Sequence, residues 1–252
     1  MSTTPLMQAT DLSIRYGVNL AVDRLNLAVP RGVSLALAGS NGAGKTSVLN
    51  ALAGLSPRGR QLNGTIAFEG VALRDGDVAQ RIGCGVRLVP DRDKVFALLS
   101  VQDNLRIGAA RTRDGAIGID DVLGWFPRLA ERRQSLAGNL SGGEQQMLGI
   151  GLALLASPRM LLLDEPTLGL AVPVIEDLCE RLARLRREVD LSMIVAESDS
   201  QWLTALADRA AVLDRGRLLR HFEVLMPADL HTIHTLMLGL DAREEANDVA
   251  HG

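Results

Sequence analysis

Residues 39–46 constrain the fold of this chain more than any other stretch. They follow the spacing glycine, four residues, glycine, lysine, then serine or threonine. Residues 33–38 before them form a short apolar run typical of a buried strand, and residues 45–53 after them have helical spacing that stops at Gly54. A plain glycine turn is the alternative, but this strand–turn–helix order predicts an anion cradle at a helix N-terminus.

Each part of this loop has a chemical task in binding phosphate. Glycines let consecutive N–H groups point inward, Lys45 brings a compact cation to the β and γ phosphates, and the Thr46 hydroxyl can ligate Mg²⁺. Lysine is rare in this chain: of the 27 lysine and arginine residues, only Lys45 and Lys94 are lysines. The candidate nucleotide-binding residues of the loop are consecutive: Gly39, Ser40, Asn41, Gly42, Ala43, Gly44, Lys45, Thr46 and Ser47.

Beyond the loop, short apolar runs alternate with helical patterns. Strands are expected at residues 65–68, 86–89, 160–163, 192–195 and 210–213, and a helix at residues 172–189. This alternation predicts an α/β fold with a mainly parallel sheet and helices on both faces. We expect one domain over residues 1–252, with a polar, frayed tail at about 241–252. A helical subdomain is expected at about 101–140, where the breaks are Gly115, Gly118, Pro127 and Gly138.

A second candidate site ends the apolar run at residues 160–163. Asp164 and Glu165 follow it directly, so two carboxylates stand at a strand end. We expect Asp164 to hold Mg²⁺ through water and Glu165 to act as the general base for the attacking water. A solvated strand end is the alternative for such a pair taken alone. No guanine-reading motif occurs around Lys94, the other lysine, which favours adenine as the base.

A further glycine pair opens the helix expected after residue 140. Ser141, Gly142 and Gly143 place small residues at a helix N-terminus, which suits a γ-phosphate. One chain does not need two cradles for one phosphate, so two chains are expected to assemble head to tail, each lending this cradle to the other. An ordinary capped helix, with Ser141 as N-cap and Glu144 reaching back, is the local alternative.

With these three motifs in this order, the chain resembles the ATP-binding subunits of ABC transporters over about residues 6–240. The resemblance implies a P-loop NTPase fold with an N-terminal antiparallel β part, and ATP with Mg²⁺ as cofactors. It places Tyr16 where the family stacks an aromatic ring on adenine. Residues 140–148, 165–171 and 89–96 are similar to the ATPase subunits of branched-chain amino acid importers, and urea importer subunits share much of this pattern.

The resemblance also implies partners and a location. These are a second ABC ATPase subunit, two transmembrane permeases and, indirectly, an extracytoplasmic solute-binding protein. The ATPase subunit would lie peripherally on the cytoplasmic face of the cell membrane. The sequence agrees, because residues 1–9 do not form a signal peptide and no apolar run approaches the length of about 20 residues that spans a bilayer. A net charge of -3 does not favour nucleic acid as a partner.

Several positions depart from the common family pattern. Asp91 stands where a glutamine usually contacts Mg²⁺, and Ser198 stands where a histidine usually contacts the γ-phosphate. Serine donates a hydrogen bond but carries no positive charge, and losing one charge-stabilising donor costs on the order of 10²-fold in rate. Ala171 and Leu152 also differ from the common aspartate and arginine. We therefore expect a heterodimer in which the opposite site carries more of the turnover, with a head-to-tail homodimer as the alternative.

Two other function classes remain open at this stage. A degenerate regulatory subunit would hold ATP with weak hydrolysis, which Ser198 and Asp91 favour and Glu165 opposes. An ABC ATPase acting on ribosomes or DNA would usually carry paired cassettes or long insertions, which the 252 residues of this sequence are expected to exclude.

The apolar residues after Asp91 are suited either to contact with a permease helix or to burial in the domain's own core. They are Val95, Phe96, Leu98 and Leu99. No metal site is expected at His221, His231 and His234, and Cys84 and Cys179 are expected to be free thiols.

Overall fold

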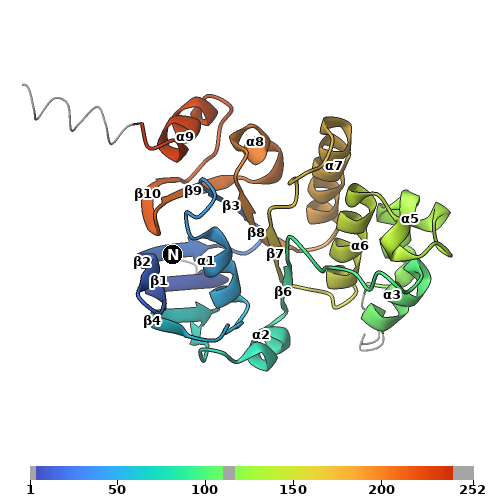
Figure 1. Ribbon diagram of the computed structural model, residues 1–252, viewed down its shortest axis with the longest axis horizontal. Coiled ribbons are helices and arrows are strands. Elements are labelled where there is room, and N and C mark those ends of the chain that lie inside the picture. Colours follow the sequence, from blue (N-terminus) through green and yellow to red (C-terminus); the bar gives the residue numbers. More distant parts are fainter. Residues whose placement is uncertain (1–3, 110–116, 241–252) are drawn as a thin grey trace, which may run out of the picture.

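The computed structural model describes residues 4–109 and 117–240, and its strands form two sheets (Figure 1). The first is a four-stranded antiparallel sheet in the order β2-β1-β4-β5. Its strands are β1 (Met7–Tyr16), β2 (Asn19–Val29), β4 (Arg60–Phe68) and β5 (Val71–Ala72). This sheet confirms the expected N-terminal antiparallel part, and β4 extends the strand expected at 65–68 by five residues at its start.

The second sheet has six strands in the order β10-β9-β3-β8-β7-β6. Five of them run parallel and β10 pairs antiparallel with β9 at the edge. Every residue of β3 and β7 is buried, which explains their uninterrupted apolar sequences. The strands are β3 (Ser34–Ala38), β6 (Val86–Val89), β7 (Met160–Asp164), β8 (Ser192–Glu197), β9 (Arg209–Asp214) and β10 (Arg217–Phe222).

Helix α1 (Lys45–Leu52) lies between the two sheets. It contacts β2 on one side and β7 and β8 on the other, and its apolar residues join one core with both sheets. The short helix α2 (Val78–Cys84) follows the antiparallel sheet and leads into β6. Because α1 is fixed from both sides, its N-terminus and the loop before it have a defined position relative to the carboxyl ends of β7 and β8.

The opposite face of the parallel sheet carries α6 (Gly142–Leu154) and α7 (Val172–Glu188). The short helices of the expected subdomain are α3 (Val101–Ala109), α4 (Ile119–Trp125), α5 (Pro127–Glu131) and η1 (Ala137–Asn139). Helices α3 and α5 pack against α6, and α4 packs against α3 and α5. Pro127 begins α5, a position where its missing N–H leaves no hydrogen bond unmade. The break expected at Gly115 lies outside the described residues.

A third, smaller core lies beside β3 and β9 under the last helices. These are η2 (Ser200–Trp202), α8 (Leu203–Leu206) and α9 (Asp229–Met237). Across the described ranges, no helix has the length and apolar character needed to span a bilayer. The polar tail expected at about 241–252 falls beyond the described residues.

Candidate functional site

The loop at residues 39–44 turns directly from β3 into α1 and leaves the N-terminus of α1 without a side-chain cap. Gly44 sits at the N-cap with φ 107°, and a Cβ there would lie 2.5 Å from the backbone oxygen of Ala21. Only glycine fits this conformation and this close approach. The first turn of α1 also lacks acidic residues, so its free N–H groups favour an anion.

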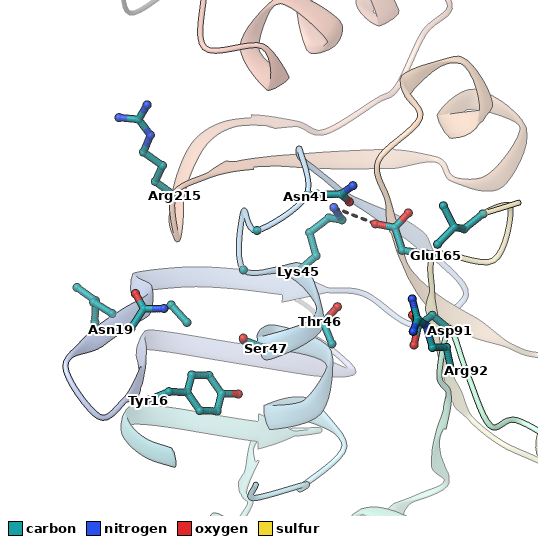
Figure 2. Close-up of a pocket in the computed structure, with 15 residues that line it drawn as sticks. Tyr16, Asn19, Asn41, Lys45, Thr46, Ser47, Asp91, Arg92, Glu165 and Arg215 are labelled. Atoms are coloured by element: carbon teal, nitrogen blue, oxygen red, sulfur yellow. Dashed lines mark ion pairs between the residues drawn. The ribbon is translucent and has the colours of Figure 1, made fainter. Parts of the chain in front are cut away.

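A cavity of about 710 Å³ opens at this helix end (Figure 2). It brings together residues from five separate parts of the sequence, including the predicted Tyr16, Lys45, Thr46, Asp91 and Glu165. The lining residues are Tyr16, Asn19, Leu20, Ala21, Asn41, Gly42, Gly44, Lys45, Thr46, Ser47, Asp91, Arg92, Glu165, Leu168 and Arg215. A space of this size with a cationic floor and an aromatic side wall is suited to a nucleotide.

Lys45 lies at the floor of the cavity with its ammonium group fully engaged. Its Nζ donates to the backbone oxygens of Gly39 at 2.6 Å and Ser40 at 3.1 Å. The same Nζ forms an ion pair with Glu165 Oε1 at 2.9 Å, drawn as a dashed line in Figure 2. The predicted base and the predicted phosphate cation are therefore in direct contact, which the sequence did not indicate.

Thr46 and Asp91 line the cavity, whereas Asp164, the last residue of β7, is buried and does not line it. The Thr46 hydroxyl donates to Asp164 Oδ1 at 3.1 Å. Burial raises the pKa of Asp164; this hydrogen bond acts in the opposite sense, and the nearby charges of Asp91 and Glu165 raise the pKa further. Asp91 is half-exposed and contacts the exposed Arg92 at 3.5 Å. Three carboxylates near one buried ammonium leave an excess of negative charge, which suits a hard cation.

Glu165 is held from its other side by Ser198. Its Oε2 accepts hydrogen bonds from the Ser198 hydroxyl at 2.8 Å and from the Ser198 N–H at 3.1 Å. The Glu165 backbone has φ 47°, a conformation that non-glycine residues adopt rarely and that recurs at functional sites. Ser198 was expected to contact a γ-phosphate; in the structure its hydroxyl donates to Glu165.

Ser141, Gly142 and Gly143 do not line this cavity. They begin α6 in the capping box expected as the local alternative: the Ser141 hydroxyl accepts from the Glu144 N–H, and the Glu144 carboxylate accepts from the Ser141 N–H. A Cβ at Gly143 would lie 2.3 Å from Val174 Cγ1 of α7. Close packing of α6 on α7 therefore requires a glycine at position 143, whereas the sequence pattern suggested only a phosphate contact as the reason for the glycine.

Sequence reasoning missed several residues of the cavity wall. They share no chemical pattern: Asn19, Leu20, Ala21, Arg92, Leu168 and Arg215. Asn19 to Ala21 follow Tyr16 through a tight turn, which is the one signal that could have indicated them. Arg215 lies in the turn between β9 and β10, far from the loop in sequence, and only the sheet order brings that turn to the cavity.

The remaining sequence expectations have mixed outcomes. Within the described ranges, no group of three or more histidine, cysteine, aspartate or glutamate side chains is placed to hold a metal ion, and His221 contacts Glu223 at 3.1 Å. Both cysteines are free, and burial raises the pKa of Cys179 to about 11. Phe96 is 52% exposed and Leu98 88% exposed, whereas Val95 and Leu99 are half-buried. Val95 packs against the core that contains α6 and α7, so only Phe96 and Leu98 of these four apolar residues are left exposed.

Comparison with known proteins gives consistent matches. Residues 22–168 match the family model described as ABC transporter. The chain is 42% identical over 161 residues to a protein of Pseudomonas aeruginosa named high-affinity branched-chain amino acid transport ATP-binding protein BraG, covering 63% of this chain and 69% of that one. It is 34% identical over 155 residues to the probable branched-chain amino acid transport ATP-binding protein LivF of Archaeoglobus fulgidus, covering 59% and 66%.

The fold has a solved counterpart. A nucleotide-free ATP-binding cassette from an ABC transporter superposes with a TM-score of 0.76 at 18% identity, covering 90% of this chain and 94% of that one. At this level of identity the likeness concerns the fold. The matched residues 22–168 include the loop, Ser141 to Gly143, Asp164 and Glu165, but neither Tyr16 nor Ser198.

Proposed function

The chain belongs to the ABC transporter family of ATP-binding proteins, and from this premise we propose that it hydrolyses ATP to power the import of branched-chain amino acids. The observation that carries the proposal is the convergence of Lys45, Thr46 and Glu165 on one cavity at the N-terminus of α1. The names of the two curated relatives favour branched-chain amino acids as the solute. Urea or another small polar solute is the alternative.

The adenine would stack on Tyr16, and the phosphates would lie over the loop. The free N–H groups of α1 and the Lys45 ammonium would bind the β and γ phosphates. Thr46 and Asp164, with Asp91 beside them, would hold Mg²⁺, because a hydroxyl and carboxylates are the hard oxygen ligands that this ion takes while keeping several waters. Bound there, Mg²⁺ supplies charge neutralisation on the phosphate oxygens.

Glu165 would orient and deprotonate the attacking water. The water oxygen forms a bond to the γ-phosphorus, the bond from the γ-phosphorus to the β–γ bridging oxygen breaks, and ADP and phosphate result. The water proton passes to the Glu165 carboxylate. Because Glu165 contacts Lys45 at 2.9 Å, a phosphate that binds Lys45 competes with Glu165 for the ammonium and releases its carboxylate toward the water.

The proposed assembly completes the site from outside the chain. Ser141, Gly142 and Gly143 of a second ATPase subunit, packed head to tail, would face the γ-phosphate, since the same residues of this chain do not line its own cavity. Two permeases would dock at the cytoplasmic face of the membrane, and a solute-binding protein would act through them. Exposed Phe96 and Leu98 support a permease contact next to Asp91.

A second candidate function is a regulatory subunit that binds ATP and hydrolyses it slowly. The observation that favours it is Ser198, whose hydroxyl donates to Glu165 at 2.8 Å and offers no positive charge to the γ-phosphate. In a heterodimer the opposite site would then carry more of the turnover. ATPase assays on this chain alone and with its paired subunit test this, and full stimulated turnover by the chain alone would contradict it.

Phosphate release by Glu165→Gln and Lys45→Ala variants separates the two functions. For an active ATPase, Glu165→Gln lowers the rate by at least about 100-fold while ATP binding is kept, because the base is lost and the competing ion pair is weakened. Lys45→Ala weakens ATP binding by about tenfold or more. The exposed Arg58→Lys variant is the control. An already slow wild type that Glu165→Gln leaves unchanged would favour the regulatory function.

A further inference from the structure

Glu197 is a buried carboxylate that the proposed reaction leaves unused. It is the last residue of β8 and only 1% exposed. Within the described residues it forms no ion pair; its partners are three hydrogen-bond donors. Oε2 accepts from the Thr167 hydroxyl at 2.6 Å, and Oε1 accepts from the N–H groups of Ser198 at 2.9 Å and Asp199 at 3.1 Å.

The three donors belong to two different loops. Thr167, itself 4% exposed, lies in the loop between β7 and α7 that begins with Glu165. Ser198 and Asp199 lie in the loop that follows β8. Both loops therefore meet on one carboxylate, and Leu168, the neighbour of Thr167, lines the nucleotide cavity.

The same Ser198 N–H is shared between two carboxylates. It donates to Glu197 Oε1 at 2.9 Å and to Glu165 Oε2 at 3.1 Å, and the Ser198 hydroxyl adds a bond of 2.8 Å to Glu165. The Glu165 N–H in turn donates to the backbone oxygen of Ala196 at 3.0 Å. The direction of the Ser198 N–H, which Glu197 holds, thus helps to determine where the Glu165 carboxylate lies.

Electrostatics makes these hydrogen bonds important for Glu197. Burial raises its pKa to about 7, the neighbouring charge of Glu165 adds to the rise, and the bonds from Thr167 and the two backbone N–H groups oppose it. A buried carboxylate without a cation depends on such donors in place of water. If any one donor were lost, the other two would rearrange around the Glu197 carboxylate.

We propose that Glu197 is a positioning residue for ATP hydrolysis: it holds the Glu165 loop and the Ser198 loop in register and thereby aims the Glu165 carboxylate at the phosphate site. The inference rests on the proposed ATPase function. Glu197 acts through Thr167 and Ser198 and does not line the nucleotide cavity.

Steady-state kinetics on the full chain, assayed with the subunits that copurify with it, tests the proposal. Glu197→Ala is expected to lower kcat by about tenfold or more and to change KM for ATP by less than about threefold, because binding groups stay in place. Glu197→Gln keeps kcat within about threefold, since its carbonyl oxygen accepts from both N–H groups and its amide donates to Thr167 Oγ1. Thr167→Val removes one of the three hydrogen bonds to Glu197, so its kcat is expected to lie between the values of Glu197→Ala and Glu197→Gln.

A buried hydroxyl elsewhere provides the matched control. Ser34 is fully buried at the start of β3, and its hydroxyl donates to the backbone oxygen of Leu206 at 2.8 Å. Ser34→Ala is expected to lower the thermal midpoint without changing kcat. The double variant Glu197→Ala with Thr167→Val is expected to lose less activity than the two single losses in kcat combined would give, because both changes break the same hydrogen bond.

Three results would overturn the inference. They are wild-type kcat in Glu197→Ala, equal loss of kcat in Glu197→Gln and Glu197→Ala, and a rise in KM that accounts for the whole effect. If Glu197→Ala does not fold, the rates of Glu197→Gln and Thr167→Val decide, and wild-type kcat in Thr167→Val overturns the inference. A wild-type assembly that releases no phosphate overturns the proposed function and this inference together.

Discussion

Lys45 occupies a site that matches the shape of an ammonium group. Its side chain is buried, and its three N–H bonds have three acceptors: two backbone oxygens of the loop and the Glu165 carboxylate. The chain otherwise uses arginine, since 27 basic residues include only two lysines. The second lysine, Lys94, packs against Gly149 of α6, where a Cβ added to the glycine would lie 2.9 Å from Lys94 Cγ. The Lys94 ammonium group donates a hydrogen bond to Gln146 Oε1.

Replacing Lys45 by arginine should therefore not be conservative. A planar guanidinium is larger than the ammonium and must displace either the loop backbone or Glu165. We expect Lys45→Arg to weaken ATP binding by about tenfold or more, measured by calorimetric titration of the full chain. Arg58→Lys is the reciprocal exchange at an exposed position and should leave affinity unchanged. Equal affinities for Lys45→Arg and wild type would show that the pocket tolerates the larger cation.

At the scale of elements, the start of α6 shows that the two glycines of one pair differ in their surroundings. Gly142 has room, because a Cβ there would meet only Leu170 Cδ2 at 3.4 Å. Gly143 has none, because a Cβ would meet Val174 Cγ1 at 2.3 Å. Close contact between α6 and α7 therefore depends on Gly143, whereas the proposed phosphate contact of the partner's nucleotide concerns both glycines.

We expect Gly143→Ala to destabilise the protein by about 1–3 kcal/mol through overpacking between α6 and α7. Gly142→Ala should have little effect on stability, because the added methyl group has room and alanine favours a helix. Thermal and denaturant unfolding of the full chain measure both. The double variant Gly143→Ala with Val174→Ala should recover much of the loss, and failure to recover it would place the strain elsewhere.

At the scale of the whole molecule, the two sheets and α1 bury charged groups at the carboxyl edge of the parallel sheet. Asp164 and Glu197 end the neighbouring strands β7 and β8, and burial raises the pKa of both. Around Glu197 the titratable groups are Glu165 from the loop after β7 and Cys179 from α7, and neither is a cation, whereas Asp199 contributes only its backbone N–H. This edge therefore makes stability depend on pH.

The sign follows from proton binding. The pKa of Glu197 rises from its ordinary 4.5 to about 7, so between these values the folded protein binds more protons than the unfolded chain. Its contribution to stability is present below about pH 4.5 and is lost as pH rises through about 7. Glu197→Gln removes this titration, so the difference in thermal midpoint between variant and wild type should shift in favour of the variant from pH 5 to pH 8. A difference independent of pH would contradict the assignment.

The sequence alone determined the loop at 39–46, the strands and helices that alternate after it, and the carboxylates at 164 and 165. These features are local: spacing, apolar runs and cap residues lie within a few positions of one another. The structure confirmed the antiparallel part, the mainly parallel sheet and the capping box of α6. It also showed that Pro127 begins a helix, a context that the breaker pattern did not reveal.

Only the tertiary structure decided which of these local features touch. The contact between Lys45 and Glu165, the sharing of the Ser198 N–H by Glu165 and Glu197, and the placement of Arg215 at the cavity all join residues far apart in the chain. They arise because the strand order places β8 between β3 and β7 and places β9 on the other side of β3, so that the segments that follow β3, β7, β8 and β9 meet at one edge. Strand order reflects how the whole core packs, and no local pattern contains it.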